Sequence, residues 1–387
     1  MAEPPLPVGY RRPTGDLPAG WTLTRLGDVA EVLSGGTLKF TKESDYVAEG
    51  FPAFSAAGPD GFVPDFEHDR PAVVVPSIGS IGRAYATSGR WTSLANTQVI
   101  LPNPERLDHR FLAHRLDGND FWPTNGTAQR YIRTADMPRC WLALPPIAEQ
   151  RRIADALDAV DTAIDAARDV AEAQERLRVG MRSELMTRGI GAHAVHTTPL
   201  GELPVTWEVA PLGEHITLIN GRSFTKSELK AEGRHRVIRI QNLSGGERWH
   251  WTDRALPAHQ YCDPGDLLYT WSGTFGPHRW EGERAIFHYH IWRVVPDRSL
   301  DPDFTFALLE HLTDAIRARS QGGLTMLHAT KSEMERHLIP IPPRTEQEAI
   351  QEALGAIADA RAAESARADQ LRVVKAGLVQ RWMREER

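Results

Sequence analysis

The chain has 387 residues, a hydrophobic content of 41% and a formal net charge of −6 at pH 7. This length fits about two or three domains, and this apolar content supports packed cores, which excludes an intrinsically disordered protein. The two cysteines, Cys140 and Cys262, form no Cys-x-x-Cys motif, which argues against structural zinc and favours a reducing compartment. The sequence shows neither an apolar run of membrane-spanning length nor a signal peptide, so we expect a cytoplasmic protein without membrane association.

Residues 1–16 are rich in Pro and Gly, which predicts a flexible tail. Residues 17–145 predict a mixed, strand-rich domain, because the short apolar runs at 72–80 and 96–102 are bounded by Gly, Pro and Asn. A helix is expected at 105–122, where large apolar side chains are spaced for one face.

Residues 146–190 predict a long helix that begins at a Pro-Pro pair and ends at Gly189 and Gly191. Its apolar residues step alternately by four and by three, which is the spacing of a coiled-coil seam. The predicted seam residues of this helix are Ile153, Leu157, Val160 and Ile164.

Residues 191–342 repeat the first domain, together with its linker, and residues 343–387 repeat the long helix. The seam of the second helix is predicted at Ile350, Leu354, Ile357, Leu371, Val374 and Leu378. The opening LPAGW at 17–21 returns as LPVTW at 203–207, and PPIAEQ at 145–150 returns as PPRTEQ at 342–347. A repeat of this length means two copies of one domain-plus-helix unit.

Two helices of about 42 residues would each be roughly 63 Å long, which exceeds the size of either domain. We therefore expect the helices to pack on each other; the alternative is that each lies along its own domain as an amphipathic helix. The predicted fold class is α+β: two tandem mixed α/β domains joined by two long antiparallel helices that form a coiled coil, with a pseudo-two-fold axis.

Two copies of one unit suit a partner that is nearly two-fold symmetric, and double-stranded DNA is the commonest such partner. Residues 1–145 contain 14 basic and 16 acidic side chains, and residues 191–342 contain 16 and 18. Neither domain is basic overall, so DNA contacts would come from local clusters, and tight binding would need a partner protein.

The sequence lacks the motifs of enzymes that act on DNA. The two Pro-Pro pairs stand in LPPI and IPPR, which lack the polar and aromatic neighbours of a methyltransferase motif, and GRSFTKS at 221–227 lacks the glycines of a nucleotide-binding loop. His288 and His290 could alternate on a strand as metal ligands, but no carboxylate or Cys stands at matching spacing. We expect no catalytic residue, and no metal or cofactor bound by this chain.

The order of the repeated motifs resembles that of a known family. LPxxWxxxxLG(E/D) opens both domains, and PPxxEQxxIxxAL opens both long helices. VVVPSIGSIGRAY at 73–85 and DPGDLLYTWSGTFGP at 263–277 are followed by GTAQRYIRTADM at 126–137 and GGLTMLHATKSEM at 322–334. Together these segments resemble the specificity (S) subunit of a type I restriction-modification system.

The resemblance implies two target recognition domains, 17–145 and 191–342, each of which reads one half of an interrupted DNA sequence. It implies that the coiled coil sets the gap and docks two modification (methyltransferase) subunits, and that restriction (motor-nuclease) subunits complete the complex. These partners would bind S-adenosylmethionine, ATP and Mg. The alternative is a coiled-coil scaffold, or the DNA-recognition subunit of another defence or methylation system.

The DNA-contact candidates are polar or basic residues on Gly-flanked loops, because Arg can read guanine and Gln or Asn can read adenine. In the first domain they are Lys39, Lys42, Ser77, Arg83, Gln129, Arg130 and Arg133, and in the second they are Arg222, Lys226, Arg239, Gln241, Asn242 and Arg279. Each could equally be a solvated surface group. Trp21 and Trp207 are expected in the two cores, whereas Trp249, Trp251 and Trp280 lie among basic residues and are candidates for stacking on DNA.

Overall fold

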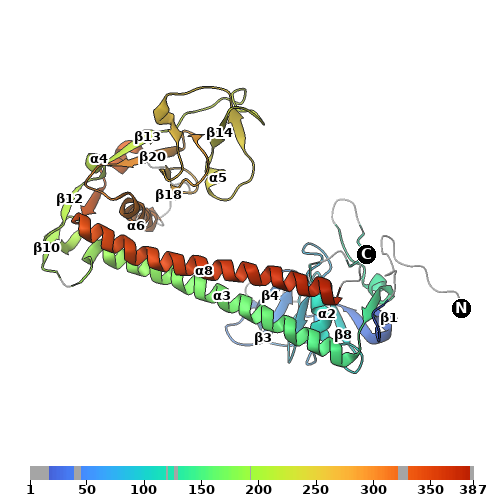
Figure 1. Ribbon diagram of the computed structural model, residues 1–387. Coiled ribbons are helices and arrows are strands. Elements are labelled where there is room, and N and C mark those ends of the chain that lie inside the picture. Colours follow the sequence, from blue (N-terminus) through green and yellow to red (C-terminus); the bar gives the residue numbers. More distant parts are fainter. Residues whose placement is uncertain are drawn as a thin grey trace. The chain divides into compact units, whose positions relative to one another are not determined.

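The computed structural model describes residues 17–38, 45–118, 121–125, 130–191, 193–320 and 330–383. The chain divides into two compact units. Unit 1 comprises Met1–Arg168 and Ser365–Arg387, and unit 2 comprises Asp169–Glu364. Each unit contains one domain, one part of the first long helix and one part of the second (Figure 1). We call residues 17–145 domain 1 and residues 191–342 domain 2.

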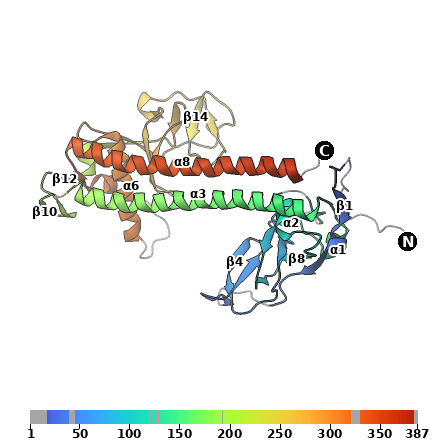
Figure 2. The same ribbon diagram turned by 60° about the horizontal axis from the view of Figure 1, so that its bottom comes forward.

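Domain 1 is built on an antiparallel sheet with the strand order β2-β8-β5-β6 (Figure 2). These strands span Ala30–Ser34, Thr97–Pro102, Ala72–Pro76 and Tyr85–Thr87. The two predicted apolar strands, β8 and β5, take the central positions. Val73 and Val74 show why: they alternate between two separate apolar clusters, so β5 is buried on both faces.

Two smaller strand pairings complete domain 1. The sheet β4-β3-β7 comprises Gly58–Val63, Phe51–Ser55 and Thr92–Ser93, and β1 (Thr22–Arg25) pairs with β9 (Trp141–Leu144). The β1-β9 pair joins the start of domain 1 to the segment that leads into the long helix. The short helix α1 (Leu26–Val29) and the 3-10 helix η2 (Thr134–Arg139) lie against each other beside this pair.

Helix α2 of domain 1 spans His109–Leu116 and is shorter than the predicted helix at 105–122. The Asp108 side chain accepts hydrogen bonds from two backbone N–H groups and caps its N-terminus. Beyond its last residue, Gly118 takes a positive φ of 72°, which no helix continues. Local capping residues, rather than the apolar spacing, therefore set the length of α2.

Domain 2 repeats this arrangement. Its main antiparallel sheet has the order β13-β20-β17-β18, spanning Ile216–Asn220, Ile291–Pro296, Leu267–Thr270 and Gly276–Arg279. A second sheet, β15-β14-β19-β16, spans His250–Thr252, His235–Ile238, Ala285–Phe287 and Tyr261–Cys262. The pair β12-β21 (Glu208–Pro211 and Leu338–Ile341) corresponds to β1-β9. In both domains the second sheet includes one parallel pair, β3-β7 or β14-β19.

The helices of domain 2 also have counterparts in domain 1, apart from a few additions. Helices α4 (Leu212–His215) and α7 (Lys331–Glu335) correspond to α1 and η2, and α6 (Pro302–Ser320) is a longer version of α2. The hairpin β10-β11 (Val195–Thr198 and Gly201–Pro204), the short helix α5 (Ile240–Leu243) and the 3-10 helix η3 (Ala258–Gln260) complete domain 2. The α+β class and the duplication that the sequence predicts are both confirmed.

The two long helices are α3 (Ile147–Arg188) and α8 (Arg344–Met383). In unit 1, Lys375 pairs with Asp161 at 2.7 Å, and Arg152 lies over the Trp382 ring at 5.7 Å. In unit 2, Arg361 lies 3.5 Å from Glu175. The order of these contacts makes the helices antiparallel in unit 1, and in unit 2 the Ile190–Glu346 hydrogen bond gives the same direction. No described helix is both long and apolar enough to span a membrane.

The seam between the helices differs from the prediction at one residue. Ile153, Leu157, Ile164, Ile350 and Leu354 are buried, and Val160, Ile357, Leu371 and Leu378 are half-buried. Val374 is 46% exposed, so its assignment to the seam is wrong. The chain steps by four after Leu371 and places the half-buried Lys375 there, and its ammonium reaches Asp161.

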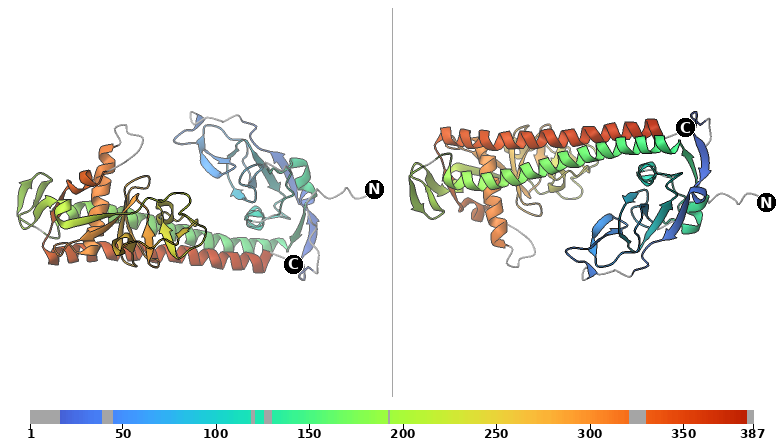
Figure 3. Two further views of the ribbon diagram at one scale, coloured as in Figure 1. Left: turned by 90° about the horizontal axis from the view of Figure 1, so that it is seen from above. Right: turned by 90° about the horizontal axis from the view of Figure 1, so that it is seen from below.

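Each domain packs directly on the helices of its own unit. Helix α2 lies between the β5-β6 part of the sheet and α3 (Figure 3). Arg110 donates hydrogen bonds to Asp155 and Asp158 of α3, and His114 lies 2.8 Å from Asp158. In unit 2, Leu185 and Met186 of α3 and Ile350 and Leu354 of α8 join the core of domain 2. The long helices are thus part of both cores.

Candidate nucleic-acid interface

A repeated glycine ends the first strand of the main sheet in both domains. A Cβ atom at Gly35 would collide with the side chains of Thr97 and Ser93, and one at Gly221 would collide with the carbonyls of Phe287 and His288. The missing side chain lets the outgoing loop run close to the neighbouring loops. In each domain several loops therefore meet at this edge of the sheet.

In domain 1 these loops are 34–38, 76–83, 93–98 and 130–134, which we call the domain 1 loop face. The Ser77 N–H donates to the Asn96 carbonyl at 2.8 Å, and the Ile132 N–H donates to the Ser77 carbonyl at 2.9 Å. Thr134 joins two more segments, because its hydroxyl donates to Gln98 at 2.7 Å and lies 3.1 Å from the Ser34 hydroxyl. Backbone and side-chain bonds thus fix the loops to one another.

The structure places four of the predicted contact residues on or beside this face. Ser77 lies within it, and the exposed Arg130 starts its last segment. Arg133 lies over the Tyr131 ring at 5.8 Å, and its guanidinium donates to the Tyr131 hydroxyl. Arg83 stands at the edge, 3.6 Å from Asp117. Lys39, Lys42 and Gln129 lie outside the described residues.

In domain 2 the corresponding loops are 222–228, 239–244, 271–274 and 288–290, which we call the domain 2 loop face. Arg222 and Tyr289 are joined through the backbone, where the Tyr289 N–H donates to the Arg222 carbonyl at 3.0 Å. Trp271 meets the same turn, with its indole N–H donating to the Tyr289 carbonyl at 2.9 Å. The Ser244 and Thr274 hydroxyls lie 3.4 Å apart.

Arg222 is held in place but not fully satisfied. Its guanidinium donates to Glu228 at 2.8 Å and lies over the Phe224 ring at 4.9 Å. Hydrogen bonds from Thr225 and Arg222 lower the pKa of Glu228 to about 2, so this carboxylate remains charged. The Nη1 atom of Arg222 is buried and has no hydrogen-bond acceptor among the described residues. A buried unpaired donor of this kind suits an incoming acceptor such as a base edge or a phosphate.

Arg239 lies beside two histidines that stay neutral. Its guanidinium is 3.4 Å from Nε2 of His250. Burial, aided by the charge of Arg239, lowers the pKa of His288 to about 4 and shifts that of His250 in the same direction. The positive charge on this part of the face therefore comes from arginine. Lys226, also predicted as a contact, lies exposed on the 222–228 loop.

An aromatic group that the sequence reading missed lies on the same face. Trp271 stacks on Trp292 at 5.8 Å and meets His290 edge-on at 5.1 Å. Tyr289 is 38% exposed and lies 3.8 Å from His290, ring centre to ring centre. The segments YTW and FHYHIW signalled these residues, but only the fold brings them together. Exposed aromatic rings beside arginines are typical of surfaces that stack on nucleotide bases.

Gln241 and Asn242, which were predicted to contact DNA bases, make hydrogen bonds to the backbone of domain 2. The Gln241 amide donates to the Arg248 carbonyl, and the Asn242 amide donates to the Gly246 and Arg248 carbonyls. The Asn242 side-chain oxygen also accepts from the Arg239 N–H. The bonds of Asn242 occupy both its side-chain oxygen and its amide, and they hold the turn that carries Arg239, whereas the Gln241 bond uses its amide.

Arg279 does not belong to the loop face. It lies at the end of β18 and pairs with Leu267, whereas the 271–274 loop joins the opposite end of the β17-β18 hairpin. Its guanidinium pairs with Asp303 and lies over Phe306, both on α6. The prediction of a DNA contact at Arg279 is therefore corrected to a contact between the hairpin and α6.

The tryptophans divide differently from the prediction. Trp207 is buried in the core of domain 2, but Trp21 is only half-buried. Trp280, predicted to stack on DNA, is 7% exposed and lies inside an apolar cluster. Arg236 lies between the rings of Trp249 and Trp251, at 4.8 and 5.0 Å, so these rings already have a cation partner.

The histidines of FHYHIW do not alternate on a strand. His288 and His290 lie on the turn between β19 and β20, with ring centres 5.3 Å apart. Within the described part of the chain, no three His, Cys, Asp or Glu side chains are grouped as a metal site would need.

A model of the type I restriction modification DNA specificity domain matches residues 18–172 and again residues 204–372. The chain belongs to this family. Each match covers one domain, its loop face and much of the long helix that follows. The chain is accordingly a specificity subunit with two recognition domains, and it serves DNA recognition in a type I restriction-modification system.

Relatives in sequence support this placement over most of the chain. The chain is 25% identical, over 89% of its length and 88% of the relative, to the putative type I restriction enzyme MjaX specificity subunit of Methanocaldococcus jannaschii. It is 27% identical to the MjaVIII specificity subunit of the same organism, over 44% of this chain and 41% of that protein. A shorter match, 24% identical, covers 38% of this chain and 32% of the EcoBI specificity subunit of Escherichia coli.

Solved structures show the same fold. The S subunit of the type I restriction-modification system of M. genitalium superposes with a TM-score of 0.60 at 16% identity, covering 97% of this chain and 100% of that chain. A chain from a study of complex assembly and conformational transition of the type I R-M system gives a TM-score of 0.58 at 19% identity, covering 96% and 99%. S subunits of these systems work in complexes with DNA and other subunits.

Proposed function

We propose that the chain reads one interrupted, unsymmetrical DNA sequence, with one half-site read by each loop face. The observation that carries this proposal is that two equivalent loop faces present different side chains. Domain 1 offers Ser77 and Arg133, whereas domain 2 offers Arg222, Arg239 and the exposed Tyr289. Because direct readout depends on the donors and acceptors at the base edges, different side chains imply different half-sites.

The chain has no catalytic activity of its own in this proposal. It holds two modification subunits over the DNA, with restriction subunits completing the complex. S-adenosylmethionine, ATP and Mg are bound by these partners. The support for a recognition role is that both loop faces present arginines and hydroxyls that make hydrogen bonds. The isolated chain should transfer no methyl groups to DNA from S-adenosylmethionine, and methyl transfer should begin when the modification subunit is added.

The long helices supply the docking surface for the modification subunits. Val170 and Leu177 of α3 are 45% and 53% exposed, and they lie two helical turns apart on one face. On α8, Val373 is 73% exposed next to Val374. We assign these apolar side chains to the part of the helix surface that the modification subunits cover.

DNA binding by variants of the full chain tests this assignment of the loop face. Arg222→Ala and Arg239→Ala should weaken binding to the methylated motif of the host and reduce its discrimination from a scrambled duplex. Each lost phosphate contact should also lower the salt dependence by about one ion. The measurement is fluorescence anisotropy at several salt concentrations, in the presence of the modification subunit because the chain is acidic overall.

Arg298→Ala is the matched control. Arg298 is exposed and follows the far end of β20, away from the 288–290 turn. This variant should bind both duplexes like the parent chain. Parent-like discrimination by Arg222→Ala and Arg239→Ala together would show that domain 2 reads DNA through another surface.

A further inference from the structure

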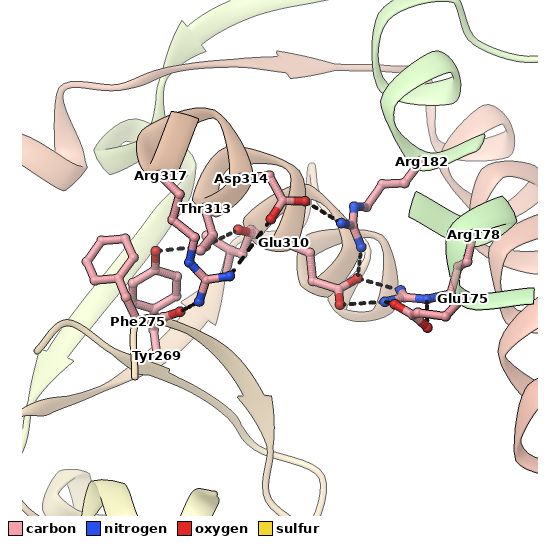
Figure 4. A network of polar contacts seen from close by, with 10 residues as sticks. Glu175, Arg178, Arg182, Tyr269, Phe275, Glu310, Thr313, Asp314 and Arg317 are labelled. Atoms are coloured by element: carbon pink, nitrogen blue, oxygen red, sulfur yellow. Dashed lines mark hydrogen bonds and ion pairs between the residues drawn. The ribbon is translucent and has the colours of Figure 1, made fainter. Parts of the chain in front are cut away.

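A network of charges around the buried Arg182 fastens domain 2 to the C-terminal half of α3 (Figure 4). Arg182 is 3% exposed, and its guanidinium donates to Glu310 at 2.8 Å and to Asp314, both on α6. Arg178 donates to Glu310 at 2.7 and 3.0 Å and to Glu175 at 2.9 Å. The two arginines of α3 thus enclose one carboxylate of α6.

The network continues into the core of domain 2. Asp314 is ion-paired with Arg317, which in turn donates to the Phe275 carbonyl. Thr313 of the same helix lies 2.9 Å from the buried Tyr269 hydroxyl. The contacts of α6 therefore join the β17-β18 hairpin of domain 2 to α3.

Unit 1 differs from unit 2 both at the long-helix residues and at the domain-helix residues of this network. The repeat places Lys375 and Val379 of α8 at the positions of Arg178 and Arg182, with the same offset of 197 residues that relates the two Pro-Pro helix starts. Lys375 pairs with Asp161 of α3, and Val379 packs against the apolar core of domain 1. The two arginines of unit 2 thus correspond in unit 1 to a lysine that pairs with α3 and a valine that packs on the core of domain 1.

The domain side changes in the same way. The N-caps Asp108 and Asp301 align α2 with α6, but α2 ends at Leu116 whereas α6 continues to Ser320. Glu310 and Asp314 both lie on the part of α6 that has no helical counterpart in domain 1. Among the described residues, the extension and the arginines that bind it therefore occur together in unit 2 and have no counterpart in unit 1.

Exchanging the partners would leave charges buried without counter-ions. Domain 1 on the C-terminal half of α3 would cover Arg182 without offering the two carboxylates. Domain 2 on the C-terminal half of α8 would place Glu310 beside Val379. A buried ion that loses its partner is strongly destabilising, whereas an ion pair replaced on both sides by apolar groups costs little. The two attachments are therefore not interchangeable.

We propose that Arg178 and Arg182 of α3, together with Glu310 and Asp314 of α6, determine which domain packs on the C-terminal half of α3. We call these four residues the pairing code. They allow domain 2 to pack there and prevent domain 1, of the same chain or of a second copy, from doing so. The pairing code acts within the protein and does not depend on bound DNA. Its consequence for DNA rests on the proposed function: because each helix half accepts one kind of domain, the two half-sites remain different.

The first test measures complementarity in the full chain by amide hydrogen exchange. Arg182→Met, or Glu310→Met with Asp314→Met, should each speed exchange in α6 and in α3 beyond Asp169 by at least tenfold. The combined triple variant should return to within about threefold of the parent, because no charge is left unpaired. If amide exchange in the triple variant is faster than in both the Arg182→Met variant and the Glu310→Met, Asp314→Met variant, the code is wrong and the contact is only a stabilising salt bridge.

The second test asks whether domain 1 rejects arginine. Val379→Arg in the full chain should speed exchange at least tenfold in α2 and in the last turns of α8, while unit 2 exchanges as in the parent. Val379→Met is the control for side-chain size and should stay within about threefold. If Val379→Arg also exchanges like the parent, domain 1 accepts the arginine and the code is wrong. Neither test uses DNA, so this result leaves the proposed function untouched.

Discussion

Gln150 and Gln347 make the same three hydrogen bonds, one set in each unit. The side-chain oxygen of each accepts from the backbone N–H of an N-cap aspartate, Asp108 at 2.9 Å or Asp301 at 2.8 Å. Each amide then donates to the carbonyl before the second proline, of Pro145 or Pro342, and to a carbonyl just before the cap. The repeated Pro-Pro-x-x-Glu-Gln motif therefore ties the start of a long helix to the start of a domain helix.

Replacing either glutamine with glutamate should loosen its own unit. Gln150 and Gln347 are 1% and 0% exposed, so the new carboxylate would face two carbonyls that have lost their donor. We expect Gln347→Glu to destabilise unit 2 by about 2–3 kcal/mol and Gln150→Glu to do the same in unit 1. Unit-resolved hydrogen exchange measures both.

The exposed Gln380 of α8 supplies the control, because Gln380→Glu adds the same charge to a solvated position. It should change neither unit by more than about 0.5 kcal/mol. An effect of Gln347→Glu that spread equally to unit 1 would contradict the local role of this glutamine.

Gly189 is expected to be the more sensitive of the two glycines that follow α3. Both have positive φ, 69° at Gly189 and 91° at Gly191. A Cβ at Gly189 would also collide with the Glu346 carboxylate, which accepts from the Ile190 N–H and the Trp207 indole N–H. Gly191→Ala should therefore cost about 1 kcal/mol of stability, from backbone strain alone, and Gly189→Ala about 2 kcal/mol or more. Thermal unfolding of the two variants compares them; equal losses would show that Glu346 moves aside without cost.

His288 should make domain 2 less stable in mild acid. Burial and the nearby charges of Arg239 and His290 lower its pKa from 6.5 to about 4. The unfolded chain therefore binds this proton before the folded one does, and stability falls as the pH drops from about 6.5 towards 4. Between pH 7 and pH 5 the loss should be about 2 kcal/mol.

Chemical denaturation of unit 2 at several pH values measures this loss. His288→Gln should remove it, while His196→Gln, at an exposed position of β10, should keep it. His250, His278 and His311 also have lowered pKa values, but they remain in both variants and cancel in the comparison. A parent-like pH profile for His288→Gln would assign the proton uptake to one of those three.

The duplicated framework could be predicted because its signals are local and occur twice. The repeated glutamines, glycines and Pro-Pro pairs mark equivalent positions in both units. The seam prediction is wrong at Val374. Of the three successive residues Val373, Val374 and Lys375, two are apolar, but the register of the helix places the lysine in the seam. Apolar periodicity does not register the stem of a lysine as a packing surface.

The loop faces could be predicted only in part, because their residues meet through long-range topology. Arg222 and Arg239 can be predicted from their own loops, but Trp271 and Tyr289 lie beside them through a sheet register that no local pattern reveals. Arg279 was placed wrongly since a hairpin has two ends, and the sequence does not show which end meets α6. Asn242 was misread because its bonds to the backbone depend on the turn it closes.

The gap between the two half-sites should depend on the length of the helix pair. Ala167 is buried in the seam of α3, next to the residue at which unit 1 ends on this helix. Four residues inserted after Ala167 add about 6 Å, or roughly one turn. An insertion of four is a stutter, which locally unwinds a coiled coil without reversing its seam, so both units should still fold.

If the helix pair is the spacer, the unspecified gap in the DNA site should grow by one or two base pairs, at about 3.4 Å each. The bases of both half-sites should stay the same, because the two loop faces lie outside the insertion. Sequencing of methylated bases in a host that carries the variant measures both. Four residues inserted between Pro199 and Leu200, in the exposed turn of β10-β11, form the control and should leave the gap unchanged. If the α3 variant still methylates DNA and keeps the original gap, the spacer lies in the partner subunits. The added turn would then have moved the domains without changing the spacing of the bases that they select.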